Sequence, residues 1–547
     1  MNRRLLALTA LALAACLLAG CSGDSLAWLR SNFQPKDTQT QAQEQAAASA
    51  SASASASAAE QAPVTAVVTA APEAVTSFGL AYQPDYGLHP YNCKSLNNRV
   101  ILSFLYEPLF AVSSAFEAVP VLAESWEVSG DGLTTTVRLH SGVTFHDGTA
   151  MTAADAAYSL NISRNSDYYG TRLSRVTSIV AQDDTTLVLT TDTAYECLPL
   201  LLDIPIIKDG SVQQTNPPGT GPYTLSGGAL VRWTGWWQTT GPLVSFDTIA
   251  LTESDTASDI RDNFEYGDAD LVETDPNSLA YVGFHNDYEL WNGTTTILQY
   301  IGYNLTAGAF TNYGLRAAVT YAIDRDAITA DCMGGFASSA VLPCSPQAGY
   351  YDGKLAAKYG YNMSGFYTQL ESAGVKDMDG DGVLDLYVTS LGYSIPVSGK
   401  MIVCSDSRSR VNAAQAVVDA LNALGFKLTL EELEYDDYHA ALRAGNFDLY
   451  YGEVRLPPNF DLSAFFSANG SLNYGGLADD TFMDLCARAL ANNGNNYDLY
   501  KRVCERGSLT PVLVKSYAVY TTRGSVQNPV SYLDWFLPGT TGTAAAG

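Results

Sequence analysis

Short stretches in which apolar and polar residues alternate are interleaved with amphipathic stretches of helical period from Glu73 to the C-terminus. The predicted strands are residues 77–82, 125–129, 134–139, 185–190, 249–253 and 428–434. The predicted helices are residues 99–105, 152–161, 313–323, 356–373 and 407–424. Because strands and helices alternate throughout this segment, the predicted fold class is α/β, and an all-β fold is excluded.

The first twenty residues have the pattern of a secretory signal peptide. Arg3 and Arg4 precede an uncharged apolar run, residues 5–18, which is shorter than the ~20 residues that span a bilayer as a helix. The run ends in Leu18-Ala19-Gly20-Cys21, which resembles the lipobox of bacterial lipoproteins. The resemblance implies cleavage before Cys21 and lipid on its thiol, where two acyl chains hold a protein more firmly than one. The alternative is an ordinary signal peptide that is cut nearby.

Residues 21–72 are predicted to be a disordered tether. Alanine and serine alternate through much of residues 39–60, and Ala, Val and Pro dominate the segment that follows. Such a sequence buries too little apolar surface to offset the entropy that is lost on ordering. As a flexible coil it would have a root-mean-square reach of roughly 40 Å. We therefore expect the tether to space a folded body from the membrane.

The net charge of the chain limits its possible partners, and its length indicates more than one lobe. Acidic residues outnumber basic ones by 57 to 30, which gives a formal charge of −27. Because such a chain repels phosphate backbones, nucleic acid is excluded as a partner. The chain has 547 residues, 47% of them apolar, and one core usually serves only ~100 to 200 residues, so we expect more than one lobe.

The reactive residues indicate neither metal nor catalytic chemistry. Nine cysteines are present. Without Cys16 and Cys21 seven remain, so at least one thiol stays unpaired, and Cys332 and Cys344 are near enough in sequence to bridge. The sequence contains no Cys-x-x-Cys unit, no Gly-x-Ser-x-Gly elbow and no His-Glu-x-x-His motif. We predict no enzyme, no cofactor and no metal centre.

Three further motifs have a structural and a functional interpretation. Residues 377–385 have the Asp and Gly spacing of a calcium loop, but Val388 stands where a bidentate glutamate belongs. A tight hairpin loop is the favoured interpretation and a weak Ca²⁺ site the alternative. His140 and His146 precede Asp147-Gly148, which makes a turn, and the glycine-rich segment 219–223 lacks a following lysine. We therefore interpret these two motifs as turns, not as a metal site or a phosphate cradle.

Six collinear motifs carry a resemblance to a known family. They are Tyr106-Glu107-Pro108-Leu109-Phe110, Val-Pro-Val-Leu-Ala-Glu-Ser-Trp-Glu-Val at 119–128, Val-Thr-Phe-His-Asp-Gly-Thr at 143–149, Gly-Thr-Gly-Pro-Tyr at 219–223, Arg-Ala-Ala-Val-Thr-Tyr-Ala-Ile-Asp-Arg-Asp at 316–326 and Gly-Asn-Phe-Asp at 445–448. Together they closely resemble the family 5 extracellular solute-binding proteins, the oligopeptide, dipeptide and nickel receptors of ABC importers. The resemblance covers nearly everything from Phe78 to the C-terminus.

The resemblance implies a two-lobed fold of the periplasmic-binding-protein type, with an inserted subdomain in the first lobe and a hinge between the lobes. The domain boundaries are a signal peptide at 1–20, the lipidated tether at 21–72, the first lobe at 73–117, 217–299 and 511–547, the inserted subdomain at 118–216 and the second lobe at 300–510. A ligand in the interlobe cleft that contacts both lobes would favour the closed state.

The implied function is that of a substrate-binding lipoprotein of an ABC transporter. It would capture peptides or related small ligands and deliver them to the permease subunits. We expect a monomer anchored by lipid at the outer face of the bacterial cytoplasmic membrane, on the cell surface or in the periplasm. A receptor for a nickel chelate or another small solute is the nearest alternative. A surface peptide sensor or adhesin on the same fold is the other.

The resemblance also implies which segments contact the ligand. Family members typically hold an extended peptide by main-chain hydrogen bonds to two strand segments, which match residues 80–88 and 450–457 here. The candidate ligand-binding residues in and around these segments are Tyr82, Gln83, Tyr86, His89, Asn304, Tyr451, Glu453, Val454 and Arg455.

One departure from the family pattern concerns the ligand end that is recognised. Members that bind a free amino terminus usually carry an aromatic residue and an Ala-Asp pair after the Gly-x-Phe-Asp motif. Here that Asp is absent, and Glu453 and Arg455 occupy the segment. We favour Arg455 as the contact, because a guanidinium stays charged and its planar fork suits a carboxylate. The alternatives are an ammonium group held by Glu453, a pair formed by the two residues, and a solvated face of an edge strand.

Overall fold

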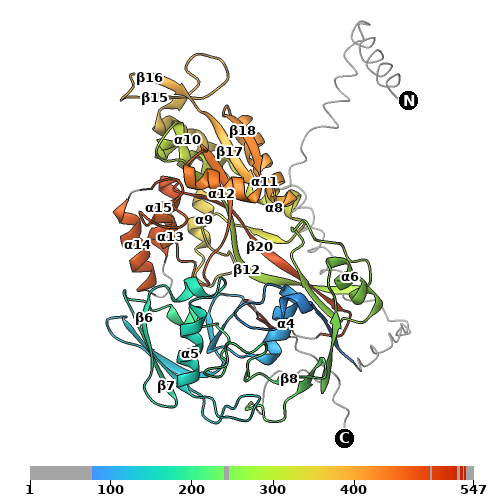
Figure 1. Cartoon of the computed structure of the whole chain (residues 1–547). Coiled ribbons are helices and arrows are strands. Elements are labelled where there is room, and N and C mark those ends of the chain that lie inside the picture. Colours follow the sequence, from blue (N-terminus) through green and yellow to red (C-terminus); the bar gives the residue numbers. More distant parts are fainter. Residues whose placement is uncertain are drawn as a thin grey trace, which may run out of the picture. The chain divides into compact units, whose positions relative to one another are not determined.

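The computed structural model describes residues 77–238, 246–477, 479–492, 496–526, 530–533 and 535–537 (Figure 1). The chain divides into two units, Met1–Ala71 and Pro72–Gly547, and all of the described residues belong to the second. The predicted signal peptide, Cys21 and the predicted tether lie outside the described residues. Within the described part of the chain, no helix has the length and apolar character needed to cross a membrane.

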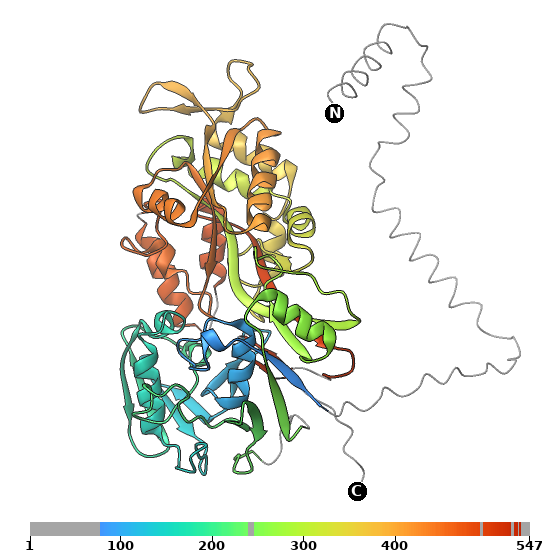
Figure 2. The ribbon, with the colours of Figure 1, turned by 45° about the vertical axis from the view of Figure 1, so that its right-hand side comes forward.

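One large mixed sheet of eleven strands is the framework of the fold, which confirms the predicted α/β class. The strand order is β18-β17-β19-β12-β20-β11-β1-β10-β9-β8, and β13 pairs with β20 beside this path. The bounds are β1 Gly79–Tyr82, β8 Tyr223–Ser226, β9 Ala229–Arg232, β10 Thr248–Glu253, β11 Leu271–Thr274, β12 Tyr288–Tyr303, β13 Ala337–Ser339, β17 Ser398–Cys404, β18 Lys427–Leu433, β19 Leu449–Arg455 and β20 Thr510–Thr522. The long antiparallel pair β12 and β20 connects the strands of the predicted first lobe with those of the predicted second lobe (Figure 2).

Residues of the predicted inserted subdomain form a separate antiparallel sheet in the order β4-β5-β7-β6. Its elements are β4 Ala123–Val128, β5 Thr134–Leu139, β6 Val176–Ala181, β7 Thr186–Thr191 and the helix α5 Ala153–Ser163, which contacts β6 and β7. The segment Ser129-Gly130-Asp131-Gly132 has the composition of a tight turn and connects β4 to β5, with a φ of 72° at Gly132. The carboxylate of Asp155 accepts hydrogen bonds from the N–H (2.8 Å) and the hydroxyl (2.9 Å) of Thr152. These bonds fix the start of α5 as the sequence predicts.

Helices begin and end near their predicted bounds, with one exception. The other α-helices in the described part of the chain are α4 Leu96–Leu105, α6 Ala257–Tyr266, α7 Tyr313–Ala322, α8 Arg325–Met333, α9 Gly353–Tyr359, α10 Met363–Ala373, α11 Arg408–Asn422, α12 Tyr435–Ala444, α13 Ser463–Phe466, α14 Asp480–Leu490 and α15 Tyr497–Arg506. The prediction of one helix over residues 356–373 is wrong. The first helix ends at Tyr359, with Gly360 as its C-cap. The side chain of Asn362 caps a second helix by accepting a hydrogen bond from the N–H of Gly365 (3.1 Å).

In the described part of the chain, buried side chains form three hydrophobic clusters. The largest extends from β1 and α4 through the inserted subdomain to α13, α14 and α15. A second lies among α7, α10, α11 and the neighbouring strands, and a small third cluster surrounds Phe264 of α6. The inserted subdomain and the helices α13 to α15, which belong to different predicted lobes, therefore share one continuous apolar interior.

The glycine-rich segment 219–223 is a turn, as predicted, and β8 begins at its last residue. A Cβ atom at Gly219 would lie 2.1 Å from the carbonyl oxygen of Leu105, so this close approach to α4 requires glycine. The Nε2 atom of His146 lies 3.0 Å from the carbonyl oxygen of Gly221. The ring of His146 therefore holds the turn.

The Asp-rich segment 377–385 is a hairpin loop between β14 Val375–Lys376 and β15 Asp385–Val388, as the favoured interpretation predicts. Strand β15 also pairs with β16 Tyr393–Pro396. Carboxylate oxygens of Asp377, Asp379 and Asp385 lie within 4.8 Å of one another. The carboxylate of Asp377 also accepts hydrogen bonds from two glycine N–H groups of the loop (2.7 and 3.0 Å). These bonds are typical of a tight Asp/Gly loop.

The seven cysteines of the described residues are all free thiols. The possible bridge between Cys332 and Cys344 is therefore not formed. Burial raises the pKa of the thiols of Cys344 and Cys504 to about 12. These cysteines act as small apolar core residues, because a buried thiol of high pKa is a poor nucleophile.

Candidate ligand-binding site

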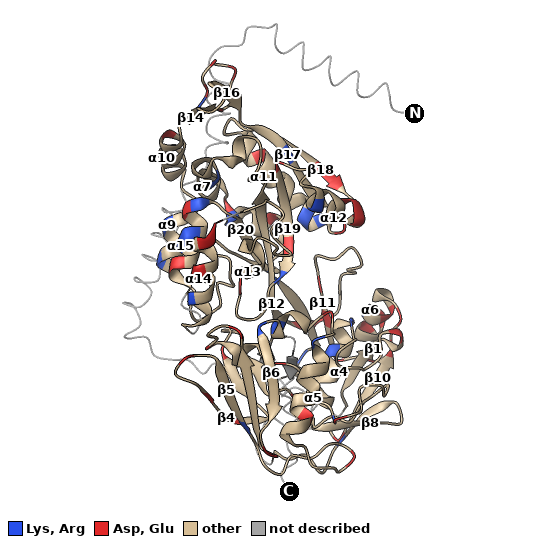
Figure 3. Ribbon diagram, turned by 60° about the vertical axis from the view of Figure 1, so that its left-hand side comes forward, with Lys and Arg blue, Asp and Glu red and all other residues tan. Residues whose placement is uncertain are grey.

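Arg455 is the last residue of β19 and lies opposite Ile297 of β12. Its guanidinium donates hydrogen bonds to the hydroxyl oxygens of Tyr517 (2.7 Å) and Tyr168 (3.3 Å). Tyr517 is on β20, whereas Tyr168 belongs to the predicted inserted subdomain. In Figure 3, β19 carries an acidic segment followed by a basic one at its end. The end of β19 therefore holds a cation where three parts of the chain meet.

The aromatic ring of Tyr168 is surrounded by guanidinium groups. The Cζ atom of Arg99 lies 3.5 Å from the ring centroid, and the Cζ atoms of Arg455 and Arg172 lie at 5.3 and 5.4 Å. Arg172 also forms a buried ion pair with Asp203. A guanidinium over an aromatic face is stabilised by the negative face of the ring and keeps its charge. Tyr168 thus keeps the cations of Arg99 and Arg455 close together.

A cavity of about 400 Å³, called the basic cavity below, is lined by Arg99, Tyr168 and Arg455. Its lining residues are Tyr91, Asn92, Cys93, Lys94, Leu96, Arg99, Asn165, Asp167, Tyr168, Arg455 and Tyr517. They include three cationic side chains and one anionic side chain. The carboxylate of Asp167 lies 3.8 Å from Lys94, but both side chains are well exposed, so this pair is weak. The positive charge and the aromatic walls suit a carboxylate with an apolar body.

The loop before α4, which supplies part of the cavity wall, is held by a hydrogen-bond network. The amide of Asn98 donates to the carbonyl oxygens of Gln83 (2.7 Å) and Gly87 (2.9 Å). Ser95 caps α4, and its hydroxyl donates to the side-chain oxygen of Gln83 (2.6 Å). The Nε2 atom of His89 lies 2.9 Å from a carbonyl oxygen of the inserted subdomain. Gln83 and His89, two candidate ligand contacts, therefore position this loop.

Glu453, two residues before Arg455, is enclosed by protein groups. Its carboxylate accepts hydrogen bonds from Arg410 and Gln299 (2.8 Å each) and lies 3.6 Å from the ammonium of Lys515. Burial raises the pKa of Glu453, but the charges of Lys515 and Arg410 lower it by more, so its pKa lies below the ordinary value. The interpretation of this segment as a solvated edge strand is wrong, because β19 lies between β17 and β12.

Lys515 extends this network across the sheet. It is on β20, its side chain is 3% exposed, and its ammonium lies 2.7 Å from the carboxylate of Asp275, which follows β11. Arg410 of α11 pairs in turn with Asp406 (2.6 Å). We call Glu453, Arg410, Lys515, Asp275 and Asp406 the Glu453 network. It ties β19, β20, α11 and the segment after β11 together.

The other candidate residues are not among the lining residues of the basic cavity. Tyr82 and Val454 pack against the core, Tyr86 is 48% exposed, and Tyr451 is fully buried with its hydroxyl hydrogen-bonded inside the sheet. The amide of Asn304 donates to two backbone carbonyl oxygens of the Gly-Asn-Phe-Asp motif (3.2 and 3.1 Å). A role of these residues in ligand binding stays a prediction.

The sequence arguments missed Arg99, Tyr168 and Tyr517. These residues come from α4, from the inserted subdomain and from β20, and they are far apart along the chain. One signal was present for Arg99. It is the one charged residue of the helix Leu96–Leu105, whose sequence is LNNRVILSFL, and a charge on such a helix needs a partner or a function.

The collinear sequence motifs, the mixed sheet and the basic cavity are the features expected of an extracellular solute-binding protein. A family model described as "Bacterial extracellular solute-binding proteins, family 5 Middle" matches residues 117–474, which is more than half of the chain. The chain belongs to this family, as its motifs predict.

One curated relative and two solved structures extend this comparison. The glutathione-binding protein GsiB of Pectobacterium atrosepticum is 29% identical over 303 residues, which cover 51% of this chain and 57% of that protein. The chain thus spans less than two thirds of the length of this relative.

The solved structures are the oligopeptide-binding protein AppA of Bacillus subtilis in complex with a nonapeptide and NikA of Brucella suis in complex with Fe(III)-EDTA. Both are 18% identical to this chain, with TM-scores of 0.57 and 0.64. Each match covers 84% of this chain, together with 98% of AppA and 99% of NikA. At this identity the likeness shows the fold alone, and the fold is that of two-lobed periplasmic binding proteins.

Proposed function

We propose that this chain is the substrate-binding component of an ABC importer and that its ligand presents a carboxylate to Arg455 in the basic cavity. The observation that carries the proposal is the oriented guanidinium of Arg455, held by Tyr517 and Tyr168 beside a second guanidinium, that of Arg99. A planar guanidinium binds a carboxylate through two parallel hydrogen bonds. The protein would bind its solute and release it unchanged.

Peptides and related amino-acid derivatives are the substrate class that we propose. The cavity of about 400 Å³ lies within the ~300 to 1,000 Å³ that is usual for small-ligand sites. Its tyrosine rings offer apolar surface to a side chain. Support also comes from the ligands named for the relatives, glutathione, a nonapeptide and Fe(III)-EDTA, because each carries carboxylates.

The first test compares an acid with its matched amide. Calorimetry on the full chain should show that trialanine binds at least about tenfold more tightly than trialanine amide, because the amide lacks the charge that strengthens the hydrogen bonds. Glutathione is the second probe. Equal affinity of the acid and the amide would contradict recognition of a carboxylate. Mass spectrometry of the ligand that co-purifies with the protein then identifies the natural solute.

Membrane attachment completes the proposed function. Cys21 would carry the lipid, and the segment 21–72 would keep the binding unit near the permease outside the cytoplasmic membrane. Changing Cys21 to Ala should move the protein from the membrane fraction to the soluble fraction or leave an unprocessed precursor. A variant that still fractionates as a mature, lipid-modified membrane protein would contradict this attachment.

A receptor for an anionic metal chelate is a second candidate function, favoured by the combination of guanidinium groups and tyrosine rings in the basic cavity. Such groups can hold the carboxylates of a chelate without binding the metal directly. Competition calorimetry with Fe(III)-EDTA and with a nickel–histidine complex against trialanine separates the two candidates. The chelate candidate requires that the chelates bind and displace trialanine.

A further inference from the structure

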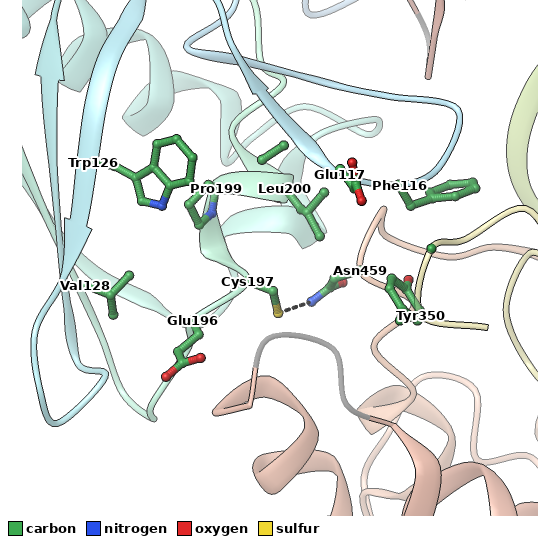
Figure 4. Close-up of a pocket in the computed structure, with 12 residues that line it drawn as sticks. Phe116, Glu117, Trp126, Val128, Glu196, Cys197, Pro199, Leu200, Tyr350 and Asn459 are labelled. Atoms are coloured by element: carbon green, nitrogen blue, oxygen red, sulfur yellow. Dashed lines mark hydrogen bonds between the residues drawn. The ribbon is translucent and has the colours of Figure 1, made fainter. Parts of the chain in front are cut away.

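A second cavity, of about 600 Å³, is lined by the inserted subdomain, by the adjoining residues 116–117 of the predicted first lobe and by loops of the predicted second lobe (Figure 4). Its lining residues are Phe116, Glu117, Ala118, Trp126, Val128, Glu196, Cys197, Pro199, Leu200, Gly349, Tyr350 and Asn459. It shares no lining residue with the basic cavity. We call it the acidic cavity, because glutamates supply its only charged side chains among these residues.

One wall of the acidic cavity is aromatic and aliphatic. Figure 4 shows Trp126 and Val128 on one side and Tyr350 and Asn459 on the other. Trp126 is 42% exposed as a whole residue, and the planes of its indole and the ring of Phe110 meet at 90°, with the centroids 5.2 Å apart. Pro199 also lines the cavity. An exposed indole face attracts a cation more strongly than the ring of Tyr or Phe does.

Two carboxylates supply the charge of this cavity. Among the described residues, neither Glu117 nor Glu196 has an ion pair or a side-chain hydrogen bond, and no Lys, Arg or His lines the cavity. Their backbones are nevertheless fixed. The N–H of Glu117 donates to the hydroxyl of Ser113 (3.1 Å), and the N–H of Glu196 donates to the carbonyl oxygen of Leu490 (3.0 Å). Both residues are exposed, so the glutamates bring uncompensated negative charge on side chains whose backbone positions are fixed.

The side opposite Trp126 carries polar groups. Asn459 is 5% exposed, and its amide donates to the hydroxyl of Tyr195 (2.8 Å) and to the sulfur of Cys197 (3.7 Å). The hydroxyl oxygen of Tyr350 is buried and has no hydrogen-bond partner among the described residues. A buried hydroxyl without a partner costs free energy, and it is an unmet hydrogen-bonding group in a residue that lines the cavity.

We propose that the acidic cavity is a second binding site, specific for an ammonium or guanidinium group on an aliphatic stem. Glu117 and Glu196 would neutralise the charge, the face of Trp126 would stabilise it further, and the stem would contact Val128 and Leu200. An organic cation fits better than a metal ion. Among the described residues, the acidic side chains whose oxygens converge as metal ligands are Asp377, Asp379 and Asp385, which lie elsewhere.

The site goes beyond the proposed function and does not depend on it, because the cation can belong to a peptide or to a free amine. The direct probe is agmatine, which carries both cationic groups on an aliphatic stem. Calorimetry on the full chain at constant ionic strength should show agmatine binding that weakens about tenfold in the double variant Glu117→Gln/Glu196→Gln. The matched control is Glu124→Gln/Glu127→Gln, which removes two exposed charges from β4 that do not line the cavity. Its agmatine affinity should stay within about twofold of the original protein.

A second variant and a peptide pair complete the test. Trp126→Leu should also weaken agmatine binding, by about threefold to tenfold, without changing binding in the basic cavity. The amide Gly-Lys-Gly-NH₂, compared with its norleucine analogue, shows whether the cation can come from a peptide. A lysine preference that is lost in the glutamine variant supports a peptide side chain as the source, and agmatine binding without that preference supports a free amine.

The proposal is overturned if agmatine does not bind at millimolar concentration, or if both double variants weaken it equally. Trialanine binding at Arg455 should be the same in all these variants, so a failure of the acidic cavity and a failure of the basic cavity are distinguishable.

Discussion

Glu453 and Arg455 are two residues apart on β19, yet their charges have opposite surroundings. Glu453 is 17% exposed and has two cationic partners, Arg410 and Lys515. Arg455 is held by the hydroxyls and rings of Tyr168 and Tyr517, and it lines the basic cavity. The position of a charged residue on a strand therefore does not determine its role. The groups that the tertiary structure places around it decide whether it holds the fold or meets a ligand.

The largest effect that we expect is a loss of protein stability when Glu453 is replaced. Glu453→Leu leaves Arg410 and Lys515 with one acidic partner each, so the free energy of unfolding should fall by about 3 kcal/mol. Urea denaturation measures this change. The control is Glu432→Leu, which removes an exposed carboxylate 4.0 Å from Arg408 and should change the stability by less than about 0.5 kcal/mol. Equal losses of stability in the two variants would contradict a special structural role of Glu453.

The second prediction concerns ligand affinity at Arg455. Arg455→Ala should weaken trialanine binding by about 1.5 to 3 kcal/mol, because it removes charge-assisted hydrogen bonds to the carboxylate. Calorimetry measures the affinity, and the control is Arg488→Ala on α14, which is 60% exposed and pairs with Asp484. An unchanged affinity in Arg455→Ala would mean that the ligand is not recognised at the end of β19.

The third prediction follows from the lowered pKa of Glu453. Its stabilising effect is complete above the unfolded-state pKa of about 4.3 and is lost as the pH falls through the lower folded-state pKa. The free energy of unfolding should therefore drop less steeply in acid for Glu453→Leu than for the original protein. Urea midpoints measured at a series of pH values from neutral downward test this. Parallel curves would mean that protonation of Glu453 does not change the free energy of unfolding.

The smallest effect sharpens the description of the basic cavity. Tyr517→Phe removes the hydroxyl that accepts the 2.7 Å hydrogen bond from Arg455 and leaves the ring in place. Trialanine affinity should fall by about 0.5 to 1.5 kcal/mol, because the guanidinium is less well oriented. Tyr266→Phe, at an 82% exposed position of α6, is the control and should bind normally. A loss as large as that of Arg455→Ala would indicate that Tyr517 contacts the ligand itself.

Local features of this protein were determined by the sequence. The alternation of strands and helices, the turns at 129–132 and 219–223, and the start of α5 at Thr152 depend on neighbouring residues, so each could be recognised without a structure. The one wrong helix prediction has a local cause as well. Residues 356–373 contain two glycines and an asparagine, and a cap at Asn362 decides between one helix and two.

The site was decided by the tertiary structure. The sequence singled out Arg455 but placed Glu453 beside it as a rival for the same ligand. The choice between these two residues depends on Lys515 and Arg410, which are 62 and 43 positions from Glu453 along the chain. The contact between Arg455 and Tyr168 joins residues 287 positions apart. Periodicity and turn chemistry report on a few neighbouring residues, whereas charge compensation depends on groups that only packing brings within hydrogen-bond distance.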